Sequence, residues 1–387
     1  MTREVELLLC CCRTRLNRGT TERIHSLIRH EIDWQYLVQL SLRHRVMPLL
    51  YQSMKKTCSQ TVPATTMEQL RTLFTANGKR NMFLTGKLIL LLELLKKYGI
   101  SAIPYKGPIL AESLYGDVAL RQFTDLDILV HKKDVEKTRD LLCSQGYESE
   151  YTLSCVQEAA YLDSKFEYTF DRNDHMVCLE VHWHIVPQYF SLNLDVERYW
   201  ERLETISICS RDVCTLRSED LLFVLCVHAV RHLWQRLAWI CDVAELINYH
   251  KNLDWEWIMK QATLFGNKRI LLLGLYLAND LLGTSIPQKL SEQMHADPIV
   301  KSLGRQVKEW LFKDYADRPK NLDYCFFHMK TRERIRDKIQ YGLRLVMTPN
   351  VKDWEFFPAI QFFLPLYYLV RPVRLAKDYL LKPLRRV

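Results

Sequence analysis

FTDLDILV, at residues 123–130, is the most informative segment of this 387-residue chain. Successive side chains of a β-strand point to opposite faces, so a strand here would place Asp125 and Asp127 together on one face and apolar side chains on the other. Two buried like charges repel each other, and each is costly to remove from water. We therefore expect a cation between them, most simply a divalent metal bound by oxygen ligands.

A second strand is expected to supply a third carboxylate. Residues 176–184 read MVCLEVHWH and alternate in the same way, with Glu180, His182 and His184 on the polar face. Asp125, Asp127 and Glu180 could together hold one or two Mg²⁺ ions, which would neutralise a triphosphate and activate a hydroxyl group for attack. Glu180 could also act as the general base. His182 could contact substrate, or be a hydrogen-bonded structural residue.

The segments around these strands predict a mixture of helices and strands. Apolar residues at helical spacing indicate helices before residue 98 and again from residue 218 onward. Between them we expect a short strand at 100–105, a helix at 109–115, a helix at 134–145 ended by Gly146, and a strand at 166–170. This pattern predicts an α+β fold rather than a long doubly wound parallel sheet.

Two histidines and the C-terminal segment leave alternatives open. His228 and His232 are four residues apart and share a helix face, for which helix packing is favoured over metal binding. The segment 356–370 is aromatic and apolar, and basic residues from Arg371 to Arg386 follow it. It could contact an anionic membrane surface, or form a terminal helix packed on the protein, which we favour.

Composition favours a cytoplasmic location and says little more about function. The net charge is +9, which suits a phosphate-bearing ligand but is more often a property of a solvated surface. The 12 cysteines include no CxxC pair, so a structural zinc site is not expected, and reduced thiols in a cytoplasmic protein are the simplest interpretation. No signal peptide is evident at the N-terminus.

Several motifs taken together resemble the uncharacterised nucleotidyltransferase family of the DNA polymerase β-type superfamily. The central motifs are Tyr-Lys-Gly at 105–107, Tyr-Gly-Asp at 115–117, Leu-Arg at 120–121, the strand at 124–130, Gly-Tyr at 146–147 and Leu-Glu-Val-His-Trp at 179–183. Less specific flanking matches are HRVMPLL at 44–50 and WICDVA at 239–244.

The resemblance implies a small mixed nucleotidyltransferase sheet with helices, flanked by helical regions. We divide the chain into an N-terminal helical region at 1–80, a nucleotidyltransferase-like core at 81–215, and a C-terminal helical region with its basic, aromatic tail at 216–387.

The resemblance also implies a phosphate-binding turn. In the superfamily, a Gly-Ser turn after the first strand cradles the triphosphate, and here Lys106, Gly107 and Pro108 occupy that turn. Gly107 permits close backbone approach, Pro108 removes one N–H donor, and Lys106 could contact phosphate directly. Arg121 could bind a β- or γ-phosphate, or form an ion pair with Asp117 or Asp125.

The function expected from these features is metal-dependent transfer of a nucleoside monophosphate from an NTP, such as ATP, to a hydroxyl-bearing small molecule or protein, with Mg²⁺ or Mn²⁺ as cofactor. A nucleic acid acceptor is not expected, because no RNA- or DNA-reading motif is present. The main alternative is a catalytically inactive nucleotide-binding or scaffold protein on the same fold. A weaker one is a glycosyltransferase that uses its Asp-x-Asp pair to bind a nucleotide sugar.

Overall fold

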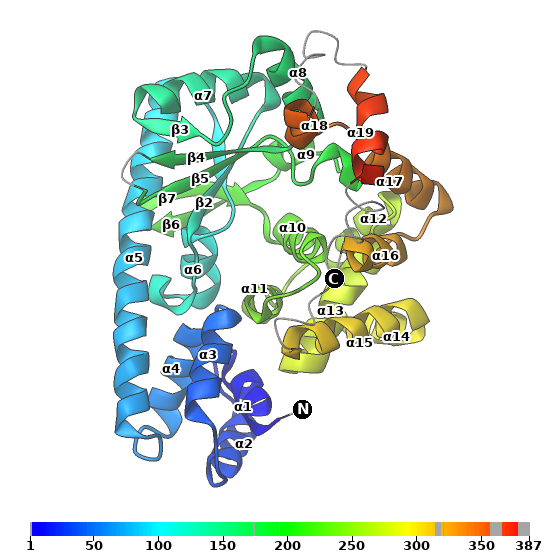
Figure 1. Ribbon diagram of the computed structural model, residues 1–387. Coiled ribbons are helices and arrows are strands. Elements are labelled where there is room, and N and C mark those ends of the chain that lie inside the picture. Colours follow the sequence, from blue (N-terminus) through cyan, green and yellow to red (C-terminus); the bar gives the residue numbers. More distant parts are fainter. Residues whose placement is uncertain are drawn as a thin grey trace.

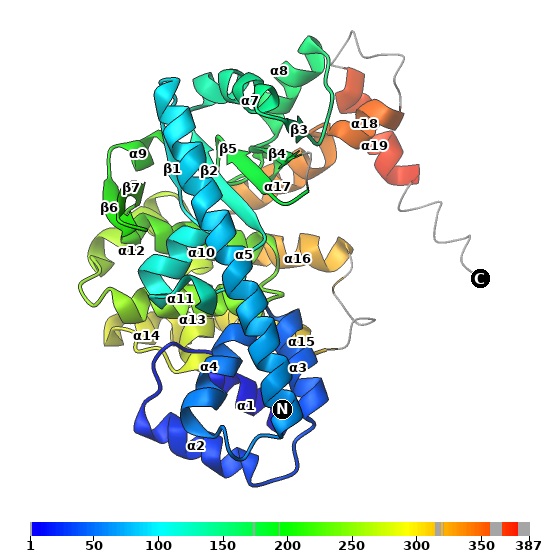
Figure 2. The same ribbon diagram turned by 90° about the vertical axis from the view of Figure 1, so that its left-hand side faces the viewer.

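The computed structural model describes residues 2–172, 175–192, 194–313, 319, 321–356 and 366–377. The N-terminal helices lie at one end of the molecule and the sheet at the other, and the long helix α5 runs along both (Figure 1). The C-terminal helices lie opposite α5 and face the sheet and the N-terminal helices (Figures 1 and 2).

The N-terminal region consists of helices. They are α1 (Arg3–Cys11), α2 (Arg18–Ile28), α3 (Trp34–Arg43), α4 (Met47–Thr57) and α5 (Ala64–Lys97). Helix α5 is 34 residues long and continues through residue 80 without a break. Leu70, near its start, packs in a core with α1–α4, whereas Leu84, Leu88 and Leu91 pack against the sheet. One rigid helix therefore spans the boundary drawn at 80 and 81, and the division into three regions stays a prediction.

The central sheet has five strands in the order β1-β2-β5-β4-β3. They are β1 (Ala102–Pro104), β2 (Asp125–Val130), β3 (Tyr147–Ser149), β4 (Glu167–Arg172) and β5 (Cys178–His182). Strands β2 and β5 pair in parallel, and the other neighbours are antiparallel. The expected α+β fold with a small mixed sheet is therefore confirmed.

Short elements lie between these strands and between β5 and the hairpin that follows. They are α6 (Pro108–Tyr115), the 3-10 turns η1 (Val118–Leu120), η2 (Lys132–Asp134) and η3 (Gln188–Phe190), α7 (Val135–Ser144), α8 (Cys155–Ser164) and α9 (Glu197–Trp200). A hairpin of β6 (Leu203–Ile208) and β7 (Arg211–Leu216) follows. The Thr215 hydroxyl donates a 2.7 Å hydrogen bond to the carbonyl of Pro104, which joins this hairpin to β1.

The two faces of the sheet have different surroundings. Leu126, Ile128 and Val130 on β2 are buried in one apolar core with side chains of α5 and α7. Leu129, on the opposite face, belongs to the other large core, which includes residues of α10 and α11. The strand alternation of the sequence thus separates an apolar face covered by α5 from a face that carries the acidic residues.

The C-terminal region packs together with the N-terminal helices. Its helices are α10 (Ser218–Arg231), α11 (Leu237–Tyr249), α12 (Trp255–Leu264), α13 (Lys268–Leu282), α14 (Gln288–Ala296), α15 (Pro298–Phe312), α16 (Asn321–Thr331), α17 (Ile335–Met347), α18 (Val351–Phe356) and α19 (Tyr367–Ala376). Buried residues of α1–α4 share one core with those of α10, α11, α13 and α15. The helical regions on the two sides of the sheet in sequence are therefore neighbours in space.

The basic C-terminal segment is partly buried. Arg371 and Arg374 of α19 bind the buried carboxylate of Asp353, at 3.1 Å and 2.5 Å. These two charges therefore face the protein and not a membrane. Residues 357–365 and 378–387 lie outside the described part, so membrane contact through them stays a prediction. No helix among the described residues combines the length and apolar character needed to cross a bilayer.

Candidate active site

The two acidic strands lie side by side with their carboxylates in register. Asp127 of β2 pairs with Glu180 of β5, and Asp125 pairs with Cys178. Residues paired across neighbouring strands point to the same face. The pairing therefore places Asp125, Asp127 and Glu180 on one face of the sheet, where all three line a pocket of about 690 Å³.

His182 connects the carboxylates of this face. Its Nε2 lies 3.2 Å from Asp127 Oδ1 and 3.4 Å from Glu180 Oε2, and its Nδ1 lies 3.3 Å from Glu167 Oε2. One ligand atom from each of Asp127, Glu180 and His182 lies within 4.8 Å of the other two. The structure thus brings His182, expected to contact substrate, into the same group as two of the three expected metal ligands.

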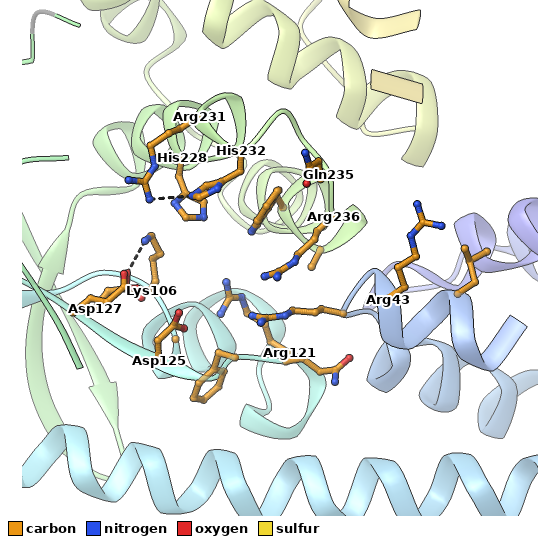
Figure 3. A pocket seen from close by; sticks show the side chains of 18 of the residues that line it. Arg43, Lys106, Arg121, Asp125, Asp127, His228, Arg231, His232, Gln235 and Arg236 are labelled. Carbon is orange, nitrogen blue, oxygen red and sulfur yellow. Dashed lines mark hydrogen bonds and ion pairs between the residues drawn. The ribbon is translucent and has the colours of Figure 1, made fainter. Parts of the chain in front are cut away.

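Lys106 and the turn after it border this group. The Lys106 ammonium donates to Asp127 Oδ1 at 2.6 Å (Figure 3). Gly107 then caps helix α6 with φ 51° and ψ −120°, a conformation that L-residues rarely adopt. A Cβ atom at this position would lie 3.2 Å from the carbonyl oxygen of Asp125. Glycine thus lets the turn lie directly against β2, beside the acidic residues.

The positive charges of Lys106 and His182 balance part of the negative charge of the carboxylates in this group. Burial opposes ionisation of Asp127, but Lys106 and His182 outweigh it and hold the pKa of this carboxyl well below its ordinary value. Burial opposes protonation of His182, yet its bonds to Asp127 and Glu180 raise its pKa to about 9. Asp125 differs, because burial and the charges of Asp127 and Glu180 raise its pKa. Asp127 is therefore firmly ionised, whereas Asp125 resists ionisation.

Arg121 has a different partner from those expected. Its Nε and Nη2 donate to the two carboxylate oxygens of Asp242 on α11, at 2.8 and 2.9 Å. The alternative of an ion pair with Asp117 or Asp125 is therefore wrong, and phosphate contact by Arg121 stays a prediction. Asp117 is not available because its carboxylate caps η1 through the N–H of Ala119, at 2.8 Å. Tyr115 also donates to Asp242, so this buried cluster joins α6 and the segment before β2 to α11.

The wall of the pocket opposite the sheet is built by helices and is rich in nitrogen. Figure 3 shows His228, Arg231, His232 and Arg236 across the pocket from Asp125 and Asp127, and Arg43 further along. The rings of His228 and His232 lie 4.8 Å apart, and both lie close to Trp239. Burial lowers the pKa of both histidines well below the usual value, so both are neutral.

Sequence reasoning missed several of these residues. Glu167 lies across from His182 in the β4–β5 register, and the alternation of Phe166, Tyr168 and Phe170 already placed it on the polar face. Arg45, Arg231 and Arg236 also line the pocket, but no local pattern distinguishes them from the other basic residues. The i, i+4 spacing places His228 and His232 on one helix face, but it does not show that this face lies across the pocket from the acidic strands.

The acidic face suits a divalent cation. Asp127 and Glu180 supply hard oxygen ligands, and His182 supplies a nitrogen that could bind a cation after losing its proton. Asp125 lies on the same face two residues away, and among the described residues its carboxylate accepts no hydrogen bond. A bound ion would replace part of the positive charge that Lys106 and His182 now provide. The donor set is therefore compatible with a divalent metal ion.

The comparisons with known proteins agree with this geometry. A family described as an uncharacterised nucleotidyltransferase matches residues 30–283, well over half of the chain. The matched region runs from just before α3 to the end of α13 and includes both walls of the pocket. Neither the curated proteins nor the solved structures contain a match. The family supports nucleotidyl transfer as the general function and a transferase as the class of enzyme. The chain belongs to the uncharacterised nucleotidyltransferase family.

Proposed function

We propose that this protein transfers a nucleoside monophosphate from an NTP to a hydroxyl group on a small molecule or a protein, with Mg²⁺ or Mn²⁺ as cofactor. The observation that carries the proposal is the register of Asp127 with Glu180 on parallel neighbouring strands, beside Asp125 and at the wall of a large pocket. A general hydrophobic pocket would not place three carboxylates on one face of a sheet, because each is costly to bury.

In this reaction the hydroxyl oxygen of the acceptor forms a bond to the α-phosphorus of the NTP. The bond from that phosphorus to the oxygen that bridges to the β-phosphate breaks, and pyrophosphate leaves with the electron pair. The hydroxyl proton passes to a carboxylate, for which Glu180 is our candidate because it is partly open to the pocket. A divalent ion held by Asp125, Asp127 and Glu180 would neutralise charge on the phosphates and make the hydroxyl more acidic.

Other residues of the pocket hold and orient the substrate in this proposal. Lys106 is the candidate phosphate contact on the sheet side, where it bonds to Asp127 and would shift toward a phosphate oxygen when a metal binds. Gly107 keeps the turn close to β2. His182 orients the carboxylates that it contacts. Arg121 lies in the same pocket, where Asp242 fixes its guanidinium.

One observation favours a second candidate function, a nucleotide-binding protein without turnover. Lys106 and His182 already balance the charge of Asp127, so the buried acidic group is satisfied without a metal. Pro108 begins α6 and provides no N–H donor to a phosphate. A protein that binds nucleotide but cannot bind the metal would have these same features.

Label transfer separates the two functions. The protein is incubated with Mg²⁺ or Mn²⁺, each α-labelled NTP and a cell lysate as a source of acceptors, beside the variant Asp125→Ala/Asp127→Ala. We expect label to move to an acceptor with the wild type and not with the variant. Nucleotide binding in calorimetry without transfer or pyrophosphate release would favour the second function. If the protein bound neither metal nor nucleotide, both proposals would be wrong.

A further inference from the structure

Arg45 lies in the turn between α3 and α4 in an unusual backbone conformation. Its φ is 57°, in the left-handed region that glycine and asparagine adopt readily and arginine rarely does. The turn is held by hydrogen bonds from the N–H of Arg45 to the carbonyl of Leu42, and from the N–H of Val46 to that of Ser41. A helix usually ends this way on glycine. Keeping arginine here costs stability, so its side chain should have a use.

The side chain of Arg45 extends into the pocket without a partner of its own. It is half-buried and lines the pocket together with Asp125 and Arg121. Within the described part of the chain, its guanidinium forms no hydrogen bond and no ion pair. Burial and the charges of Arg236 and Arg121 lower its pKa, and Asp125 is the carboxylate that offsets them. Like charges held together in a partly buried place favour the binding of an anion.

A second arginine, Arg236, lies in a segment that His44 joins to this turn by hydrogen bonds. The N–H of Leu237 donates to Nδ1 of His44 at 3.3 Å, and the N–H of Ala238 donates to the carbonyl of His44 at 3.2 Å. These bonds join the turn that carries Arg45 to the start of α11, directly after Arg236. His44 is fully buried, so these hydrogen bonds are shielded from water and join the two distant segments that carry Arg45 and Arg236.

The turn at Lys106, Gly107 and Pro108, which the proposed function assigns to phosphate binding, has few N–H groups left to donate to a phosphate. Pro108 has no N–H, and the N–H of Ile109 already donates to the carbonyl of Lys106 at 3.0 Å. The ammonium of Lys106 is bonded to Asp127. The turn therefore has less to offer a triphosphate than a helix N-terminus normally does. A highly charged ligand at the acidic residues would need further cations, and Arg45 and Arg236 supply them.

We infer that Arg45 and Arg236 bind the β- and γ-phosphates of the nucleoside triphosphate, an inference that rests on the proposed function. Lys106 and Asp125 of the sheet side line the same pocket as Arg45 and Arg236 of the helix side. An α-phosphate held beside the acidic residues would leave its β- and γ-phosphates in the pocket that Arg45 and Arg236 also line. The guanidinium of Arg236 also lies over the ring of Trp239, with its Cζ 5.4 Å from the ring centroid.

The test measures binding of inorganic triphosphate by calorimetry, with Mg²⁺ present, to the wild type and to Arg45→Gly. Glycine removes the side chain and suits the left-handed backbone, so we expect a melting temperature close to that of the wild type. Loss of a charge-assisted contact should weaken binding by about 10- to 100-fold. Arg236→Gln should weaken it to a similar extent. Arg305→Gln, an exposed arginine on α15 outside the pocket, should leave binding unchanged.

A comparison of ATP with AMP separates triphosphate binding from binding of an acceptor phosphate. We expect Arg45→Gly to weaken the binding of ATP and to leave that of AMP unchanged. An equal loss for both nucleotides, unchanged triphosphate binding in Arg45→Gly, or no binding by the wild type would each overturn the inference.

The two proposals fail in different ways. If the wild type binds triphosphate through Arg45 but transfers no label, the proposed transfer is wrong and the phosphate subsite stands. If the wild type transfers label and Arg45→Gly binds triphosphate equally well, the subsite is wrong and the transfer stands.

Discussion

The two walls of the pocket are built in opposite ways. On the sheet wall, Asp127 and Glu180 lie in register on adjacent strands, and Lys106 and His182 balance their charges within a few ångströms. On the helical wall, Arg45 and Arg236 come from segments far apart in sequence, and the hydrogen bonds of His44 hold them together. The sheet wall is acidic, whereas the helical wall is basic, and we infer that it binds an anion.

This difference suggests a division of labour. Strand pairing fixes side chains with little freedom, which suits groups that must hold a metal and act on the reacting atoms. Long arginine side chains on helices and turns tolerate small changes in position and suit the binding of phosphates. Substitutions in the sheet wall should therefore affect transfer most, and substitutions in the helical wall should affect the binding of triphosphate.

The largest expected effect is that of Asp127→Asn on transfer. The substitution keeps the shape of the side chain but removes the charge that Lys106, His182 and a metal ion would share. We expect the rate of label transfer to fall by about 10³-fold or more, because loss of a metal ligand removes several kcal/mol of transition-state stabilisation. Asp140→Asn, the same change at an exposed position on α7, is the control. Transfer within tenfold of the wild type would remove Asp127 from the site.

The second prediction concerns the ion pair that joins the walls. Asp242→Leu leaves the buried guanidinium of Arg121 without its carboxylate, which should cost about 3–5 kcal/mol of unfolding free energy in urea denaturation. The double variant Arg121→Met/Asp242→Leu removes both charges and should recover most of this loss. If the single variant lost less than about 1 kcal/mol, the pair would not join the two walls energetically.

The sheet wall could be predicted from the sequence largely because its information is local. Alternation in two short segments placed Asp125, Asp127 and Glu180 on polar faces, and the parallel pairing of β2 with β5 brought them together. The same reasoning would have found Glu167, whose segment also alternates. Asp117 and Asp125, the alternative ion-pair partners of Arg121, were wrong because the carboxylate that it binds, Asp242, lies 121 residues away.

The helical wall could not be predicted in this way. Its arginines are among 54 basic residues, and helix periodicity alone does not show which of them face a pocket. Their position depends on the packing of α3 and α4 against α10 and α11, which follows from a core formed by distant segments. The buried hydrogen bonds of His44 have no counterpart in any short sequence pattern.

The third prediction tests how closely the turn at Gly107, which we propose to bind phosphate, must lie against β2. Gly107→Ala places a Cβ atom 3.2 Å from the carbonyl oxygen of Asp125 at a φ of 51°, which should cost about 2–3 kcal/mol of unfolding free energy. It should also weaken NTP binding, because the turn must move away from the acidic residues. The control is Gly86→Ala in α5, where nothing lies near the new atom and about 0.5–1 kcal/mol should be gained. Equal effects of the two substitutions would contradict the role of Gly107.

The smallest expected effect is a loss of stability in acid that comes from the helical side of the protein and not from the sheet wall. His328 of α16 is buried, its Nε2 lies 3.1 Å from the carbonyl of Val230 on α10, and its Nδ1 lies 3.2 Å from the hydroxyl of Tyr341. Burial, with the nearby charge of Arg332, lowers its pKa to about 3. His182 on the sheet wall, with a pKa of about 9, is already protonated at neutral pH.

The sign of the effect follows from these values. The folded protein holds His328 neutral, so its contribution to stability is complete above the ordinary pKa of about 6.5 and is lost as the pH falls toward 3. Between pH 7.5 and pH 5 this one residue should account for about 2 kcal/mol of unfolding free energy. Urea denaturation of His328→Gln should show a pH dependence smaller by that amount, while His25→Gln, at an exposed position, should match the wild type. The backbone carbonyl beside His328 belongs to the last turn of α10, which precedes Arg236. Protonation of His328 in acid should therefore destabilise the helical wall before the sheet wall. An unchanged pH dependence in His328→Gln would mean that the helical wall does not depend on this neutral histidine.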